Sequence, residues 1–119
     1  MVRKIKGESI WIVDHYEIGR HSRILHLRLP KDIVHKYDIR RGDKVKAMLI
    51  HVKSKLPGSR KVKLWFVYLF PVRTHARRLY LPLDPAITRL YDIEKGDEIK
   101  AMLVEVFKDP REDDEENDG

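Results

Sequence analysis

The second half of this chain repeats the first half at a constant offset, which places Trp65 on Trp11 and His75 on His21. Residues 11–53 align with residues 65–107 without a gap, and 18 of the 43 aligned positions are identical. The absence of gaps indicates that both copies keep one backbone shape. A unit of roughly 45 residues is too small to bury a good hydrophobic core alone. We therefore expect the two copies to pack together as a fused pseudo-dimer with an approximate twofold axis.

Charge is distributed unevenly along the 119 residues, whose net charge is +6. Residues 109–119 contain seven acidic residues and one arginine, or −6, which leaves +12 for residues 1–108. The acidic tail has no apolar residue to bury, so we expect it to be disordered. The basic body indicates a polyanionic partner, most often nucleic acid. A charged surface that serves only solubility is the alternative.

Several classes of function lack their usual sequence signals. The chain has no cysteine, which excludes disulfides, thiolate metal sites and cysteine nucleophiles. It has no phosphate-binding glycine loop and no paired carboxylates outside the tail. It also lacks an apolar run of ~18 residues, so no membrane span is expected. We therefore expect a cytoplasmic protein that is not an enzyme and uses no cofactor and no metal.

Each copy begins with a predicted strand, at residues 9–13 and at residues 62–70. Both runs are rich in β-branched and aromatic side chains, which favour strands. The second run is long and apolar, so we expect it to be buried on both faces. This places Trp65 and its counterpart Trp11 in the core, with stacking of the two indoles on nucleic-acid bases as the alternative.

Polar segments follow at residues 14–23 and 71–77, and they predict hairpins. Alternation then predicts the second strand of each copy. In the first copy leucine occupies every second position, while His26 and Arg28 point to the other side. Leucine alternates in the same way through residues 79–83 of the second copy.

A short helix and a last strand complete each unit. Asp84, which is followed by a proline, has the features of a helix N-cap. A Gly-Asp pair at residues 42–43 and again at 96–97 predicts a tight turn closed by the aspartate. The last strands are expected at residues 45–52 and 99–106.

The expected fold class is therefore mainly β with two short helices, built from duplicated β-β-α-β units. We expect one domain over residues 1–108. Repeat 1 covers about 9–53, a linker covers 54–61, and repeat 2 covers about 62–108. Residues 109–119 form the disordered acidic tail.

The stretch from residue 27 to residue 45 resembles the AbrB/MazE/SpoVT family. It has a strand that ends in Leu29-Pro30, a short helix, an aliphatic residue, the Gly-Asp pair and a further strand. The second copy differs by having Asp84 in place of the proline. In that family two chains exchange hairpins to form one small barrel. The resemblance thus implies one pseudo-twofold AbrB-like β-barrel and a monomer that acts as a pseudo-dimer, with RIFT and double-psi connections as alternatives.

Many members of the family bind DNA as transcription regulators or antitoxins, through basic residues of the first hairpin and near the helix start. Carried over by position, the nucleic-acid-binding candidates are Arg20, His21, Arg23, Lys31 and Lys36 in the first copy and Arg73, His75, Arg77, Arg78 and Arg89 in the second. His21 and His75 are symmetry mates that could approach each other across the pseudo-axis, but a metal site would need further ligands.

The resemblance and the charge together predict a nucleic-acid-binding protein, most simply a DNA-binding transcription regulator or chromatin-type factor, with RNA as the other polymer. The alternative is a non-enzymatic interaction module, such as an antitoxin or a ribosome-associated protein. The two halves differ in net charge, since residues 1–60 carry +9 (15 − 6) and residues 61–108 carry +3 (9 − 6). This difference favours an asymmetric use of the two contact surfaces. The acidic tail could bind a basic protein.

Overall fold

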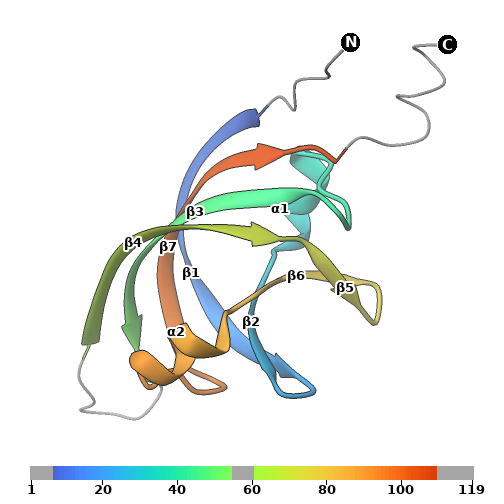
Figure 1. The fold of residues 1–119 in the computed structure, drawn as a ribbon. Coiled ribbons are helices and arrows are strands. Elements are labelled where there is room, and N and C mark those ends of the chain that lie inside the picture. Colours follow the sequence, from blue (N-terminus) through green and yellow to red (C-terminus); the bar gives the residue numbers. More distant parts are fainter. Residues whose placement is uncertain (1–6, 55–60, 110–119) are drawn as a thin grey trace, which may run out of the picture.

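The computed structural model describes residues 7–54 and 61–109, in which seven antiparallel strands form one sheet accompanied by two short helices (Figure 1). The elements are β1 (Gly7–His21), β2 (Ile24–Arg28), α1 (Lys31–Lys36), β3 (Lys44–Lys53), β4 (Lys61–Pro71), β5 (Arg73–His75), β6 (Arg78–Pro82), α2 (Pro85–Leu90) and β7 (Glu98–Phe107). The strand order is β4-β3-β7-β1-β2-β6-β5. Most of the expected linker and the tail beyond residue 109 lie outside the described residues.

The sequence repeat is also visible in the elements. β2 and β6, α1 and α2, and β3 and β7 begin at equivalent positions of the two repeats, and β4 with β5 corresponds to β1. The first strand of each repeat pairs with the last strand of the other repeat. Tyr16 of β1 lies opposite Ile99 of β7, and the equivalent Phe70 of β4 lies opposite Val45 of β3. Neither repeat therefore completes its own sheet.

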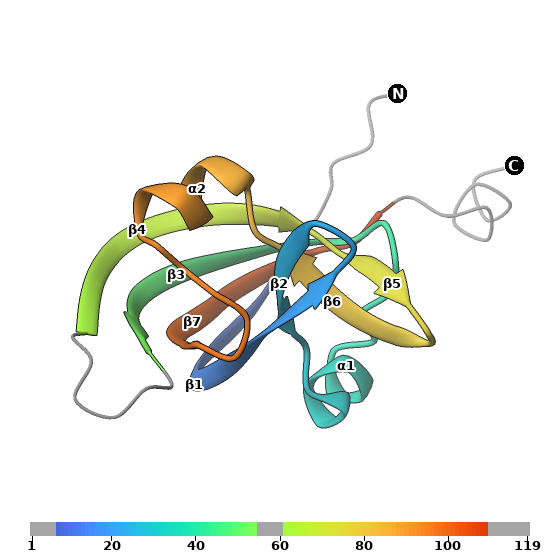
Figure 2. The ribbon, with the colours of Figure 1, turned by 90° about the horizontal axis from the view of Figure 1, so that it is seen from below.

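Two strand pairs join equivalent positions of the repeats. Leu27 of β2 lies opposite Leu81 of β6, and Met48 of β3 lies opposite Met102 of β7. Leu27 and Leu81 are equivalent residues of the two repeats, and so are Met48 and Met102. Each antiparallel ladder is therefore symmetric about this central residue pair. The helices lie far apart, on opposite sides of the molecule (Figure 2). The fully buried side chains that form the centre of the core are Ile18, Leu27, Val45, Leu49, Phe70, Leu81, Leu83, Ile99, Leu103 and Val106.

The expected hairpins at residues 14–23 and 71–77 are too long. β1 continues to His21, and in the first repeat only residues 22–23 form the turn. The polar side chains of β1 face solvent while Tyr16 and Ile18 between them are buried, so this polar stretch is the outer face of a strand. In the second repeat β5 occupies part of the segment, and its turn lies at residues 76–77.

The expected burial of both tryptophans is wrong. Trp11 is 63% exposed and Trp65 is 61% exposed. Each lies in a β-bulge with a positive φ, 56° for Trp11 and 51° for Trp65. Because a bulge inserts one extra residue, it changes the face to which the side chain points. The bulges therefore turn both indoles outward.

The run from residue 64 to residue 70 is buried on one face only, in contrast to the prediction. Leu64 and Phe70 are buried, whereas Val67 and Leu69 are about half exposed. β4 lies at an end of the strand order beside β3, and the side chains of Val67 and Leu69 on its outer face stay exposed. An uninterrupted apolar run does not distinguish a strand buried on both faces from one that exposes an apolar surface.

The Gly-Asp turns form as predicted. Gly42 and Gly96 have positive φ values of 97° and 91°. The Oδ2 atom of Asp43 accepts the backbone N–H of Arg40 at 2.9 Å, and Oδ2 of Asp97 accepts the equivalent N–H of Glu94 at 2.8 Å. The N-cap is also confirmed, since the Asp84 carboxylate accepts the backbone N–H of Ala86 at 2.8 Å.

Asp43 has additional partners at the end of β7, and these predict unequal roles for the two turn aspartates. Its Oδ1 accepts the backbone N–H of Asp109 at 2.9 Å, and the Lys108 ammonium lies 3.5 Å from Oδ2. We expect Asp97→Ala to lower the free energy of unfolding by about 2 kcal/mol and Asp43→Ala by about 4 kcal/mol, because more hydrogen bonds to a buried carboxylate are lost. Urea unfolding measures both values. Equal losses would mean that the Lys108 and Asp109 contacts do not stabilise the fold.

Among the described residues, neither α1 nor α2 is long and apolar enough to cross a membrane.

Candidate functional site

Four aromatic rings meet where the two hairpins come together. His21 and His75 are equivalent residues of the two repeats, and their rings stack with centroids 3.5 Å apart. His26 and Tyr80 are also equivalent, with centroids 4.5 Å apart. The expectation that His21 and His75 approach each other is therefore confirmed. We call His21, His26, His75 and Tyr80 the ring cluster.

The strand register explains how the ring cluster forms. His26 lies opposite Gly19 of β1, which has no side chain. A Cβ atom at Gly19 would lie 2.6 Å from Nε2 of His26 and 2.9 Å from Nε of Arg28. Gly19 thus leaves space for both side chains to lie over the backbone of β1. As a result His26 is only 7% exposed, although it is on the outer face of β2.

Arginines from both repeats flank the ring cluster. Arg28 of β2 lies opposite Tyr80 of β6, and Tyr80 in turn lies opposite Arg73 of β5. His75 lies opposite Arg78. Cross-strand partners share a face of the sheet, so these arginines lie on the same face as the rings. Arg28 was not among the predicted site residues, although the alternation along residues 25–29 had already placed it on this face.

The structure divides the ten predicted residues into three groups. Seven belong to the two hairpins, namely Arg20, His21, Arg23, Arg73, His75, Arg77 and Arg78. Lys31 joins them indirectly, because it lines a cleft together with Arg77 and Arg78.

The remaining two predicted residues lie apart from this group. Lys36 is on α1, where its ammonium lies 5.5 Å from the centre of the Tyr37 ring. Arg89 is on α2, where its Nε donates to the carbonyl of Pro85 at 3.4 Å. Because the two helices lie on opposite sides of the molecule (Figure 2), these two side chains do not share one surface.

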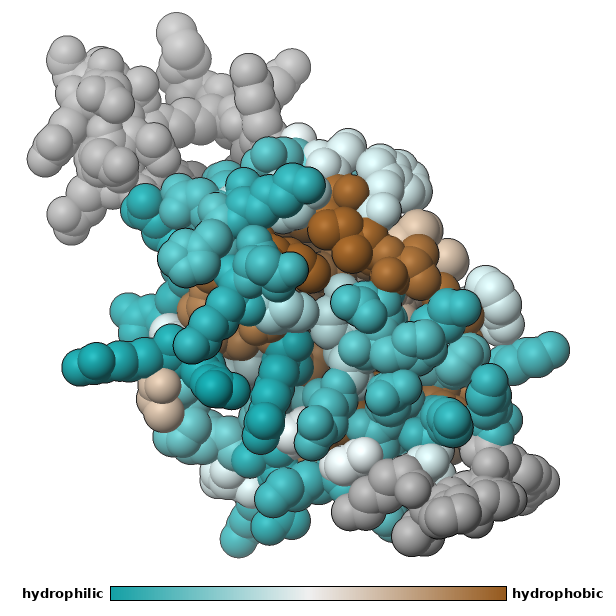
Figure 3. Space-filling view, turned by 180° about the vertical axis from the view of Figure 1, so that it is seen from behind, coloured by the Kyte–Doolittle hydropathy of each residue, from teal (hydrophilic) through white to brown (hydrophobic). Residues whose placement is uncertain are grey.

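A second surface of interest is apolar. In one row across four strands, Val67 of β4 lies opposite Met48, Met48 opposite Met102, and Met102 opposite Val13 of β1. Val67 and Val13 are each about half exposed, and Trp11 and Trp65 add to the apolar residues exposed on β1 and β4. We call these six residues the outer apolar face. In the view from behind, a band of apolar side chains lies between hydrophilic ones (Figure 3).

The surroundings of His26, the most buried histidine of the ring cluster, act on its protonation. Burial lowers the pKa of His26 below its ordinary value of 6.5, and the charges of Arg28, His21 and His75 lower it further. Burial lowers the pKa of His51 as well, followed by the charges of Lys61 and Lys100. Both residues therefore resist protonation in the folded protein.

These two shifts predict that acid destabilises the fold. Because the folded-state pKa of His26 lies below 6.5, the unfolded chain takes up the proton first as the pH falls. The contribution of neutral His26 is complete above pH 6.5 and is lost as the pH falls through the folded-state pKa, and His51 has the same sign. Urea unfolding should show that the free energy of unfolding declines from about pH 7.5 to about pH 5.5. The decline should be smaller in His26→Gln and smaller still in the double variant His26→Gln/His51→Gln. An unchanged decline in the double variant would contradict this assignment.

No metal centre is found within residues 7–54 and 61–109, since no three histidine, aspartate or glutamate side chains are suitably grouped there. The fold and the site thus describe a mainly β protein whose two hairpins bring basic and aromatic side chains together. Comparisons with family models, with curated proteins and with solved structures found no match.

Proposed function

We propose that this chain is a non-enzymatic nucleic-acid-binding protein of AbrB-like type, acting as a DNA-binding transcription regulator or chromatin-type factor. The main support for this proposal is the stacking of the His21 ring on the His75 ring, with ring centroids 3.5 Å apart. It joins the hairpins of both repeats, so that arginines from both copies lie around one ring cluster. A fused repeat would thereby present the paired surface that two separate chains present in the family.

The strand pairing supports an AbrB-like barrel as the scaffold. Each repeat contributes its first strand to the other repeat, as exchanged hairpins would. The strands at the two ends of the sheet order, β4 and β5, follow each other in the chain with only Val72 between them. Val72 also donates its N–H to the carbonyl of Asp43 at 2.8 Å and accepts the N–H of Gly42 at 3.1 Å. We infer that the sheet closes on itself through this continuous segment.

In this proposal the arginines bind phosphates and the rings contact bases. Arginine presents a planar set of donors that suits phosphate oxygens. Exposed rings such as His75 can stack on an unpaired base, and such stacking tolerates many sequences. DNA is the favoured polymer because of the family resemblance, and RNA is the second choice. The monomer would act as a pseudo-dimer.

A salt-titrated binding series tests the proposal. The full chain is titrated with duplex DNA, with single strands and with structured RNA over a range of salt concentrations. We expect the affinity for at least one polymer to fall steeply, with a log–log slope of about −0.9 for each phosphate contact on duplex DNA. A chain that binds none of the three at low salt would refute the proposal.

The outer apolar face favours a second candidate, an interaction module of the antitoxin or ribosome-associated kind. Exposed apolar patches with polar borders mark protein contact sites, and Trp11 and Trp65 are the largest exposed rings on β1 and β4. Tryptophan is enriched at the centres of protein interfaces. If the salt series finds no binding to nucleic acid, this candidate replaces the first.

A further inference from the structure

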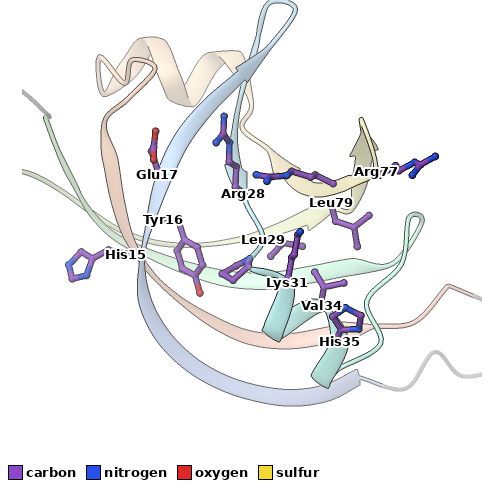
Figure 4. Close-up of a pocket in the computed structure, with 12 residues that line it drawn as sticks. His15, Tyr16, Glu17, Arg28, Leu29, Lys31, Val34, His35, Arg77 and Leu79 are labelled. Carbon is purple, nitrogen blue, oxygen red and sulfur yellow. The ribbon is translucent and has the colours of Figure 1, made fainter.

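A cleft of about 640 Å³ lies between β1, the start of α1 and the β5–β6 hairpin (Figure 4). Four cationic side chains line it, Arg28, Lys31, Arg77 and Arg78, against one carboxylate, Glu17. Lys31 points from the start of α1 towards the middle of the cleft (Figure 4). Apolar side chains, among them Leu29, Val34 and Leu79, form part of the wall. The cleft therefore combines positive charge with apolar surface, as sites for organic anions do.

A buried hydroxyl group adds a second and independent signal. Tyr16 belongs to the lining of this cleft and is only 3% exposed. Its hydroxyl is fully buried and has no hydrogen-bond partner among the described residues. A buried polar group without a partner costs free energy and is rare in folded proteins. The hydroxyl has no access to solvent, so a ligand oxygen would reach it only if the lining side chains moved apart, and such a ligand would then supply the missing partner.

The internal repeat provides a control for what the fold itself requires. The counterparts of Tyr16, Arg28 and Lys31 in the second repeat are Phe70, Pro82 and Pro85. The second repeat builds the same strand, strand and helix with these uncharged residues. Phe70 is completely buried in the core, so the position needs an aromatic ring but no hydroxyl. The polar side chains of the first repeat are thus unnecessary for the backbone, and a ligand would account for them.

We propose that this cleft binds a small organic phosphomonoester. Lys31 and the three arginines would hold the phosphate, because charge-assisted hydrogen bonds to its oxygens are the strongest available there. The Tyr16 hydroxyl would donate to a ligand oxygen, and the apolar wall at Leu79 would contact the organic part. This inference goes beyond polymer binding through the hairpins, and the cleft shares Arg28, Arg77 and Arg78 with the arginines of that surface. A free mononucleotide and the 5′-phosphate at the end of a strand share this chemistry.

Isothermal titration of the full chain at low salt with AMP, adenosine and inorganic phosphate tests the proposal. We expect AMP to bind more tightly than phosphate, and adenosine not to bind. Tyr16→Phe, which copies the second repeat, should weaken AMP binding about fivefold, the effect of one hydrogen bond. Lys31→Met should weaken it about tenfold or more. Lys36→Met, on the same helix but outside the cleft, removes the same charge and should leave AMP binding unchanged. Thermal melting confirms that each variant is folded.

Two results would overturn the proposal, namely failure of the wild-type chain to bind AMP and equal losses for Lys31→Met and Lys36→Met. A parallel titration with short strands that carry or lack a 5′-phosphate identifies the source of the ligand. A preference for the phosphorylated strand assigns the cleft to strand ends, and equal binding of both strands assigns it to a free ligand. Blunt duplex DNA without terminal phosphates serves as the separate test of the hairpin surface. If Lys31→Met weakens binding of that duplex as much as it weakens binding of AMP, the cleft is only part of the polymer-binding surface and the proposal fails.

Discussion

Either repeat expressed alone should fail to form a folded monomer. In the intact chain β1 pairs with β7 and β4 pairs with β3, so a single repeat keeps only the short hairpin pairing and lacks the partner for most of its first strand. The two halves of the chain, divided after Ser54 and produced separately, should show little β-structure by circular dichroism at low concentration. At higher concentration each should associate into a dimer that exchanges first strands. We expect the loss of folded structure in the isolated halves to be complete, because about half of an already small hydrophobic core is absent.

The intact chain and a mixture of the halves serve as controls for this experiment. Light scattering should find the intact chain monomeric at every concentration, because the fused repeat already supplies the exchanged strand. Mixing the two halves should restore the circular dichroism spectrum of the intact chain. A half that folds as a stable monomer, or an intact chain that is an obligate dimer, would show that the strand exchange does not hold the two repeats together.

Replacing three hairpin arginines by alanine should largely remove the salt-dependent binding of nucleic acid. Arg20, Arg23 and Arg73 are all exposed, and none of them lines the cleft beside α1. If each arginine neutralises one phosphate, the log–log salt slope on duplex DNA should fall by about 0.9 per residue, or about 2.7 in all. The fold should persist, because these side chains are outside the core and surface substitutions usually have small effects. Fluorescence anisotropy at several salt concentrations gives the slope.

A matched variant tests whether position or total charge matters. The matched positions are at the opposite end of the sheet, where β3 ends and β4 begins (Figure 1), and they are Lys53, Lys61 and Lys63. Replacing these three lysines by alanine removes the same charge. We expect this variant to keep nearly the whole salt slope. If it loses as much affinity as the arginine variant, binding depends on a diffuse basic surface, and the hairpin site is wrong. If neither variant alters binding, neither surface is used.

Much of the fold was predictable from the sequence because the information is local. The alternation along β2 placed Leu27 inside and Arg28 outside, since successive side chains of a strand point to opposite faces. The cap at Asp84 and the turn at Gly42-Asp43 depend on residues a few positions apart. The repeat itself predicted two matching units, and equivalent elements begin at equivalent positions as a result.

The chemistry of the hairpins was predictable only in part. The family resemblance selected His21 and His75, and their equivalence suggested that they could meet. It did not select His26 or Tyr80, whose contact depends on the space above Gly19 and on the register of β2 against β6. A register between strands from different repeats is a long-range property that no local pattern encodes.

The sequence by itself determined the duplication, the order of the elements, the turns and the sign of the charge, because each follows from composition or from short-range periodicity. Only the tertiary structure decided which strand pairs with which, and therefore that each repeat completes the sheet of the other. It also decided that Trp11 and Trp65 face outward, because a bulge against the neighbouring strand changes their direction. The cleft beside Tyr16 is likewise decided by the tertiary structure, because its walls come from both repeats and exist only when the two repeats pack together.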